Sequence, residues 1–234
     1  MNIIENALAD GERFLSEYDS KKLLFEYGIP TASEIKVDSL EGARQAARDI
    51  RFPVVLKGLC PGVTHKTEKD LVILNINSES DLETAFEKLS TNPKERCGEF
   101  LVQEMIYGQR ELIGGFLRDP QFGPCVMLGL GGIFTEILRD VSFRLAPLTD
   151  RDVEEMMNDL RCKNIFGPIR GMKEVDKKTL AKILVSIAAL GIEYEAITEI
   201  DVNPIIINAS GEPIAVDAVI SLTEPSIRDS WKSS

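Results

Sequence analysis

The stretch VVLKGLCPGVTHKTEKD, residues 54–70, contains a lysine, Lys57, after an apolar run and a histidine in a loop. Three apolar residues followed by Lys57 are typical of a buried strand that ends on a cation. The loop after it contains Pro, Gly and His65, which is the one histidine among 234 residues. A buried ammonium group needs an anion, whereas a lysine at a strand end can also extend to water. For Lys57 alone, both interpretations stay open.

Helices and strands alternate on both sides of this stretch in the first half of the chain. A helix over residues 19–27 is expected to end at Gly28, which suits a left-handed terminal position. Asp38 with Glu41, and Ser80 with Glu83, have the spacing of helix-capping boxes. Further helices are therefore expected up to Ile50 and Leu89, and strands over residues 32–37, 53–58 and 71–76.

The second half of the chain favours strands joined by turns. Strands are expected over residues 99–106, 111–118, 124–131, 196–202, 204–208 and 214–220. Thr149 predicts the start of an acidic helix to about Leu160, and another helix is expected over residues 176–190. The sequence predicts an α+β fold with a boundary near residues 91–100 and a hinge at residues 92–93.

Composition narrows the class of protein. Apolar residues make up 44% and charged residues 28%, with a net charge of −11 and a pI of about 4.8. This balance argues against general binding to nucleic acid or to anionic membranes. There is no apolar run of roughly 20 residues, and the acidic N-terminus lacks the features of a secretory signal. A cytoplasmic protein is expected, and its four well-separated cysteines are expected to be unreactive thiols rather than zinc ligands.

Oxygen-bearing side chains gather in TEIDVNPIII, residues 198–207. Glu199, Asp201 and Asn203 alternate with apolar residues, so on a strand all three lie on one face. Asp217 follows fourteen residues after Asn203, across the NASGEP turn. Carboxylate and amide oxygens suit Mg²⁺ bound to nucleotide phosphates. The alternative is a polar strand face in water, but like charges on one face favour a cation.

A glycine cluster lies in GLGGIFTE, residues 129–136. Glycines at a strand end allow backbone N–H groups to approach an anion. Phe134 occupies the place of the last glycine in the G-x-G-x-x-G pattern, and a simple tight turn is an equally good interpretation.

The ordered set of these segments resembles the ATP-grasp fold, from about Ser20 to Leu222. SKKLLFEYGIPTASE resembles its first helix and strand, FPVVLKG its lysine-bearing strand, and VQEMIYGQRELIGGF its hinge. The resemblance implies two α+β subdomains with the nucleotide bound between them. A lid subdomain is expected over residues 20–98, and a larger subdomain over residues 1–19 and 99–234.

The resemblance also implies residue roles. Lys57 is expected to bind phosphate, and Glu104 and Glu111 match the family's adenine-side and ribose-side carboxylates. Asn203 and Asp217 match its Mg²⁺ ligands. The remaining residues expected at the ADP/ATP site are Val102, Met105, Ile106, Gly131 and Gly132.

Within this fold, the chain resembles in particular the β subunits of ADP-forming acetyl-CoA synthetases, which are related to succinyl-CoA synthetase. CPGVTHKTEKD, GLGGIFTEILRDVSFRLAPL and EIDVNPIII carry this resemblance. It implies the reaction acyl-CoA + ADP + phosphate ⇌ carboxylate + CoA + ATP. The chain is expected to be half of the enzyme, with a CoA-binding α subunit as partner in a heterotetramer.

In this family, His65 resembles a relay histidine that passes a phosphoryl group from a histidine of the α subunit to ADP. Asp201 or Glu199 is expected to orient its imidazole, and Arg144 to compensate charge. Without the family resemblance, a solvated loop histidine is the better interpretation of His65. Relatives read H-K-S-D-x-G-G-V here, whereas this chain has Asp70 and Leu71 at the two glycine positions.

Two alternatives remain from the sequence. One is another ATP-grasp carboxylate ligase, which forms a free acyl phosphate and needs no phosphohistidine. The other is a non-catalytic nucleotide-binding subunit, against which the full set of expected site residues argues.

Overall fold

The chain crosses between two units at residues 31–32 and again at residues 106–107. The computed structural model describes residues 3–60, 70–92, 97–132 and 139–223. The smaller unit is Ala32–Ile106, and the larger unit comprises Met1–Thr31 and Tyr107–Ser234.

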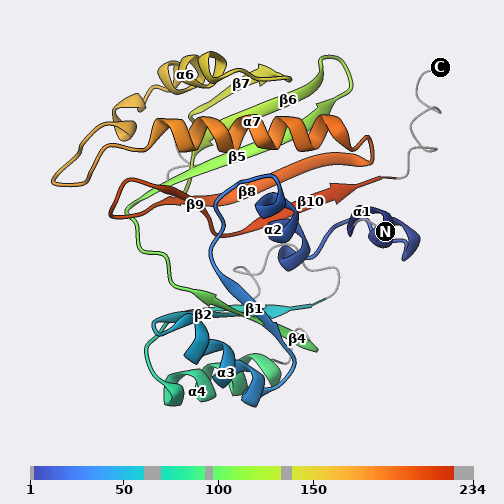
Figure 1. Ribbon diagram of the computed structural model, residues 1–234, viewed down its shortest axis with the longest axis vertical. Helices are drawn as coiled ribbons and strands as arrows, with labels where there is room; N and C mark the ends of the chain where they lie inside the picture. The colour runs from blue at the N-terminus through green and yellow to red at the C-terminus, as the bar shows by residue number, and fades with distance from the viewer. Residues whose placement is uncertain (1–2, 61–69, 93–96, 133–138, 224–234) are drawn as a thin grey trace. The chain divides into compact units, whose positions relative to one another are not determined.

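The smaller unit is a four-stranded sheet with two helices on one face (Figure 1). Its strands follow the order β1 (Glu34–Val37), β4 (Glu99–Glu104), β2 (Val54–Leu59) and β3 (Val72–Ile76), all antiparallel. Helices α3 (Leu40–Ile50) and α4 (Glu79–Ser90) cover the face that carries the apolar core of the unit. The opposite face carries the residues of interest below.

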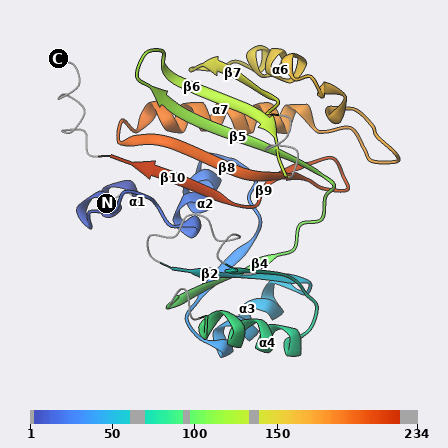
Figure 2. The ribbon, with the colours of Figure 1, turned by 180° about the vertical axis from the view of Figure 1, so that it is seen from behind.

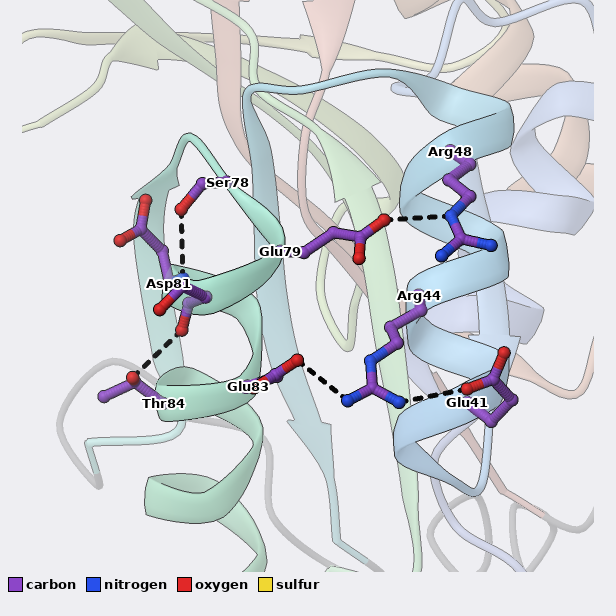
Figure 3. Close-up of polar contacts among 9 residues, drawn as sticks. Glu41, Arg44, Arg48, Ser78, Glu79, Asp81, Glu83 and Thr84 are labelled. Atoms are coloured by element: carbon purple, nitrogen blue, oxygen red, sulfur yellow. Dashed lines mark hydrogen bonds and ion pairs between the residues drawn. The ribbon is translucent and has the colours of Figure 1, made fainter.

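Ion pairs join the outer surfaces of α3 and α4 (Figure 3). Arg44 contacts Glu83 at 2.8 Å and Glu41 at 3.0 Å, and Arg48 contacts Glu79 at 2.9 Å. The hydrogen bond from Arg48 holds the pKa of Glu79 below its ordinary value. Solvent screens exposed pairs of this kind, so they contribute little stability, and the alanine-rich interface beneath them holds the helices.

Two of the expected helix caps are wrong by one or two residues. Ser39, not Asp38, caps α3 by accepting a hydrogen bond from the N–H of Gly42. Ser78, not Ser80, caps α4 through the N–H of Asp81. Ser39 and Ser78 both have the extended backbone that is typical of an N-cap residue.

The bounds of the units differ from the expected 20–98 at both ends. Leu23, Leu24 and Ile29 are buried in the core of the larger unit, so residues 20–31 belong there. Strand β4 pairs with both β1 and β2, so residues 99–106 belong to the smaller unit. The chain therefore crosses after Ile106 rather than at the expected hinge near residues 92–93.

The larger unit is built on a six-stranded antiparallel sheet (Figure 2). The strand order is β10 (Ala218–Leu222), β8 (Ile197–Ile207), β5 (Arg110–Asp119), β6 (Gly123–Leu130) and β7 (Val141–Leu145), with β9 (Pro213–Ala215) also on β8. The helices are α1 (Ile3–Ala9), α2 (Glu17–Glu26), α6 (Asp150–Asp159) and α7 (Lys177–Glu193), with a 3-10 turn at Lys163–Phe166. Apolar residues of α2, α6 and α7 share one core with one face of the sheet.

Several elements of this unit agree with the expectation and several do not. Thr149 caps α6 in a full capping box with Asp152, and Asp176 caps α7. The two strands expected over residues 196–208 are one strand, β8, which continues through Pro204. Helix α1 and strand β7 were not predicted. No helix among residues 3–60, 70–92, 97–132 and 139–223 combines the length and the apolar character needed to cross a bilayer.

Helix α7 packs through Gly191 onto the ring of Phe116. A Cβ atom on Gly191 would lie 2.5 Å from Cε2 of that ring. Glycine to alanine in a helix ordinarily stabilises by up to about 1 kcal/mol, but overpacking a buried contact costs about 1–3 kcal/mol. Gly191→Ala is therefore expected to lower the free energy of unfolding by about 1–2 kcal/mol, as measured by urea denaturation.

The control for this prediction is Lys182→Ala, at an exposed position of the same helix. It is expected to change the free energy of unfolding by less than about 0.5 kcal/mol. A Gly191→Ala variant as stable as the wild type would contradict the close packing of α7 on β5.

Cys60 and Cys97 are joined by a disulfide, with Cα atoms 4.4 Å apart. The expectation of four separate thiols is therefore wrong for this pair. The register of the sheet explains it: Leu59 lies opposite Glu99, so the residues just beyond the paired ends of β2 and β4 meet. Cys125 and Cys162 are free thiols.

Candidate functional site

In the smaller unit, Lys57 lies in the middle of the sheet on the face opposite α3 and α4. Its neighbours Val54 and Leu56 belong to the helix-covered core, and the alternation of β2 places Lys57 on the other face. Lys57 is 3% exposed and lies opposite Leu101 of β4. A lysine so deeply buried is held there by polar or anionic groups, which argues against a solvated strand-end lysine. Phosphate binding by Lys57 stays a prediction.

Glu104 ends β4 and is fixed by the backbone of the strand beside it. Its Oε1 atom accepts a hydrogen bond of 2.6 Å from the N–H of Ser33, and its own N–H donates to the carbonyl of Ser33. The next residue, Met105, donates its N–H to the carbonyl of Pro53. Met105 and Ile106 are half-buried and end the smaller unit. The structure thus brings these expected nucleotide-binding residues to one end of the sheet.

Val102 does not join them. Its side chain is fully buried in the core under α3 and α4. Its backbone lies between Ile35 of β1 and Leu56 of β2, because β4 is a central strand. With the side chain in the core and both strand edges paired, Val102 supports the sheet and is withdrawn as a nucleotide contact.

In the larger unit, β8 carries Glu199, Asp201 and Asn203 on the sheet face away from the core. Ile200 and Val202, which alternate with them, belong to that core. The N–H of Asn203 donates to the carbonyl of Asp217 at 3.1 Å, so Asp217 lies directly beside Asn203. Strands β8 and β10, neighbours in Figure 1, therefore bring the four oxygen-bearing residues together along one strand pair.

Arg144 lies on the opposite face of the same sheet. It pairs in register with Val126, which is buried in the core, and its guanidinium contacts Asp159 of α6 at 2.6 Å. This hydrogen bond holds the pKa of Asp159 below its ordinary value. Arg144 therefore lies on the sheet face opposite Asp201 and Glu199, because one register position on β7 separates the two faces. Its expected role in charge compensation stays a prediction.

Glu111 is surrounded by the glycines that follow β6. The N–H of Gly131 donates to the carbonyl of Glu111 at 2.8 Å. A Cβ atom on Gly131 would lie 2.9 Å from the Glu111 backbone, and one on Gly132 would lie 3.0 Å from its carboxylate. Gly132 also has a φ of +67°. These glycines are needed for close packing around Glu111, which holds its carboxylate at the end of the sheet.

His65 falls in residues 61–69, outside the described residues. The residue that follows this segment, Asp70, has a φ of +58°. Glycine adopts this left-handed conformation freely, and aspartate is among the residues that tolerate it. Asp70 therefore adopts a backbone conformation that glycine favours.

Asn203 and Asp217 fit a hard cation by their donor chemistry, since an amide oxygen and a carboxylate are both ligands that Mg²⁺ accepts. In the described part of the chain there is no group of three or more His, Cys, Asp or Glu residues placed to hold a metal ion. A pair with few protein ligands is typical of Mg²⁺ that is also bound by substrate phosphates.

Several buried polar residues were not predicted from the sequence, among them Gln103 and Lys21. Gln103 is fully buried on the same sheet face as Lys57, opposite Val55. Gln103 directly follows three apolar residues in the strand EFLVQE, and this is a signal that could have identified it. Lys21 is 1% exposed in α2, and it falls in EYDSKK, the mostly polar and charged start of that helix, so no local signal marks it.

A match described as an ATP-grasp domain covers residues 6–222. The β subunit of ADP-forming acetate–CoA ligase I from Pyrococcus furiosus is 40% identical over 221 residues, which is 92% of this chain and 94% of that protein. The chain belongs to the ATP-grasp family, among the β subunits of ADP-forming acetate–CoA ligases.

Further relatives include a longer protein and a solved structure with bound ligands. ADP-forming acetate–CoA ligase I of Archaeoglobus fulgidus is 39% identical over 89% of this chain, which spans only 31% of that longer protein. A structure of the Candidatus Korarchaeum cryptofilum dinucleotide-forming acetyl-CoA synthetase 1 covers 94% of this chain and 98% of that chain at 39% identity, with a TM-score of 0.83. It contains coenzyme A and Mg-AMPPCP, with its phosphohistidine segment pointing towards the nucleotide-binding site. The expected ATP-grasp fold and β-subunit family are confirmed.

Proposed function

We propose that this β subunit binds ADP and ATP for an ADP-forming acyl-CoA ligase, with acetate as the acyl group. The reaction is acyl-CoA + ADP + phosphate ⇌ carboxylate + CoA + ATP. The observation that carries the proposal is the 40% identity to an acetate–CoA ligase β subunit over 94% of its length. The cytoplasmic location expected from the sequence remains a prediction.

Each unit supplies residues to this proposal. In the smaller unit, buried Lys57 would bind phosphate, while Glu104, Met105 and Ile106 would lie on the adenine side. In the larger unit, Glu111 would bind ribose, and the backbone at Gly131 and Gly132 would approach a phosphate group. Asn203 and Asp217 would hold Mg²⁺, which supplies charge neutralisation on the phosphate oxygens.

His65 would relay the phosphoryl group in this proposal. A neutral imidazole is a competent nucleophile near pH 7. Asp201 or Glu199 would hold the imidazole in the reactive tautomer, as carboxylates do for other catalytic histidines. Support comes from the positions of these carboxylates on β8, the strand that also carries the proposed Mg²⁺ ligand Asn203.

The partner in this proposal is a CoA-binding α subunit, corresponding to the part of the single-chain relatives that this chain does not span. An apolar surface on the larger unit suits it. Val141, Phe143 and Leu145 of β7 are 39%, 51% and 58% exposed. The cross-strand rows Leu145–Cys125–Leu117 and Phe143–Met127–Gly115 continue to Glu199 and Asp201. We define these β5–β7 residues as the apolar sheet face.

We assign this face to the α subunit because it is continuous with the carboxylates that the proposed phosphoryl transfer uses. The partner must deliver its phosphoryl group beside Asp201 and Glu199, and a contiguous apolar surface of this kind marks a protein interface. A heterotetramer is the expected assembly.

Phe143→Asp is expected to weaken association with the α subunit by at least about tenfold, because a charge would be buried in an apolar interface. The measurement is sedimentation velocity over a concentration series. Phe25→Asp is the matched control, since Phe25 is 67% exposed on α2 of the same unit. If Phe143→Asp and the wild type bind the α subunit with equal affinity, the apolar sheet face is not part of the interface.

The experiment that tests the function is reconstitution with a candidate α subunit. Release of the CoA thiol from acetyl-CoA is measured with ADP and phosphate, alone and together. The proposal expects release that requires both co-substrates and both subunits. Turnover by this chain alone through a hydroxamate-trappable acyl phosphate would favour a different ATP-grasp ligase. Nucleotide binding without turnover would favour a non-catalytic subunit.

A further inference from the structure

An ion pair within α2 is almost completely shielded from water. Lys21 Nζ lies 2.9 Å from Glu17 Oε1, and both side chains are 1% exposed. The two residues are four apart, on one side of the helix. Burying a charged pair costs desolvation energy that its own attraction often only balances. The pair is therefore poorly explained as a source of stability.

The ammonium group of Lys21 reaches a second partner far away in the sequence. Its Nζ atom donates to the carbonyl of Val216 at 3.1 Å. Val216 and Asp217 fall in the break between β9, which ends at Ala215, and β10, which begins at Ala218. Both residues lie outside β9 and β10, and the carbonyl of Val216 accepts its hydrogen bond from a side chain of α2.

Val216 is linked to both expected metal ligands, to Asp217 along the chain and to Asn203 through Pro204. Its N–H donates to the carbonyl of Pro204 at 3.0 Å, and Pro204 follows Asn203. Its other neighbour is Asp217, whose carbonyl accepts from the N–H of Asn203 at 3.1 Å. Before the break, the N–H of Ala215 donates to the carbonyl of Pro30. The break is thus tied to the α2 segment on one side and to β8 on the other.

We propose that Lys21, held in place by Glu17, is a positioning residue for the metal pair Asn203 and Asp217. It fixes the peptide between Val216 and Asp217, and so sets where the Asp217 carboxylate lies relative to Asn203. The proposal rests on the proposed function, since it takes these two residues as the Mg²⁺ ligands. Groups that orient metal ligands typically account for 10- to 100-fold in metal affinity.

The test compares ADP affinity in EDTA with ADP affinity in excess Mg²⁺, both by isothermal titration calorimetry on the full chain. The ratio of the two dissociation constants is the Mg²⁺-dependent gain. Lys21→Met alone would leave Glu17 buried without its ammonium partner, so the informative variant is the double change Glu17→Gln and Lys21→Met. Its Mg²⁺-dependent gain is expected to be about tenfold smaller than that of the wild type, while its ADP affinity in EDTA stays the same.

Two variants serve as controls. Glu17→Gln keeps the Lys21 donor and is expected to retain most of the gain. Arg118→Met removes another cation that binds main-chain carbonyls in the same unit, those of Gly191, Tyr194 and Ile197. It is expected to lower the melting temperature and to leave the gain unchanged.

Asp217→Asn separates the two levels of the argument. If Asp217→Asn loses the gain and the double variant keeps it, the positioning role of Lys21 is wrong and the metal pair stands. If Asp217→Asn keeps the gain, the metal pair itself fails, and the positioning role fails with it. An equal loss in Arg118→Met would attribute the effect to general destabilisation and overturn the role of Lys21.

Discussion

His65→Ala is expected to abolish phosphorylation of this chain and to reduce ligase turnover at least about a thousandfold. The imidazole is the proposed nucleophile, and no second histidine exists in the sequence to replace it. A phosphorylated histidine is labile to acid and stable to base, unlike a phosphoserine or an acyl phosphate. The measurement is transfer of label from γ-labelled ATP and Mg²⁺, quenched within a single turnover, with and without the α subunit.

Asp201→Asn and Glu199→Gln are the companions of this variant. Both residues lie on the same face of β8, and neither would bond to the phosphoryl group. Both variants are expected to retain the label. Substitution of whichever residue orients His65 is expected to slow formation of the label. If the wild type binds ATP but shows no acid-labile label in the presence of the α subunit, the relay through His65 is wrong, and the ligase uses the histidine of the partner alone.

Lys57→Met is expected to weaken binding of ATP by about 10- to 100-fold, the equivalent of about 1.5–3 kcal/mol for a hydrogen bond to a charged group. Lys57 is 3% exposed on the face of the smaller sheet away from its helices. Methionine has a similar length and suits a buried position, so the fold is expected to survive. The measurement is calorimetric titration with ATP and Mg²⁺, together with a melting curve.

Lys36→Met is the matched control, because Lys36 and Lys57 flank Leu101 in the register of the same sheet. Lys36 is 39% exposed and pairs with Glu99 at 3.0 Å. Its replacement is expected to leave ATP affinity within about twofold of the wild type, since a screened surface pair contributes little. Equal losses in the two variants would show that Lys57 acts only through the general charge of the unit.

The boundaries of elements illustrate how far local sequence patterns reach. Thr149 caps its helix as expected, in a capping box with Asp152. Asp176, the expected first residue of the next helix, is the cap of that helix. The other two helices are capped by Ser39 and Ser78 rather than by the expected Asp38 and Ser80. A cap depends on which of several adjacent side chains takes the extended backbone conformation, and spacing alone does not decide between neighbours.

Local sequence is enough to place Glu199, Asp201 and Asn203 on one face, because side chains alternate along any strand with a period of two. It also placed Lys57 in a buried strand, and the family motifs identified the fold. Tertiary structure alone decided which strands pair and in which register. Register put Arg144 on the opposite face from the carboxylates and brought Cys60 to Cys97. It also brought Lys21 to a carbonyl 195 residues away, because contacts between distant segments follow from packing the whole chain.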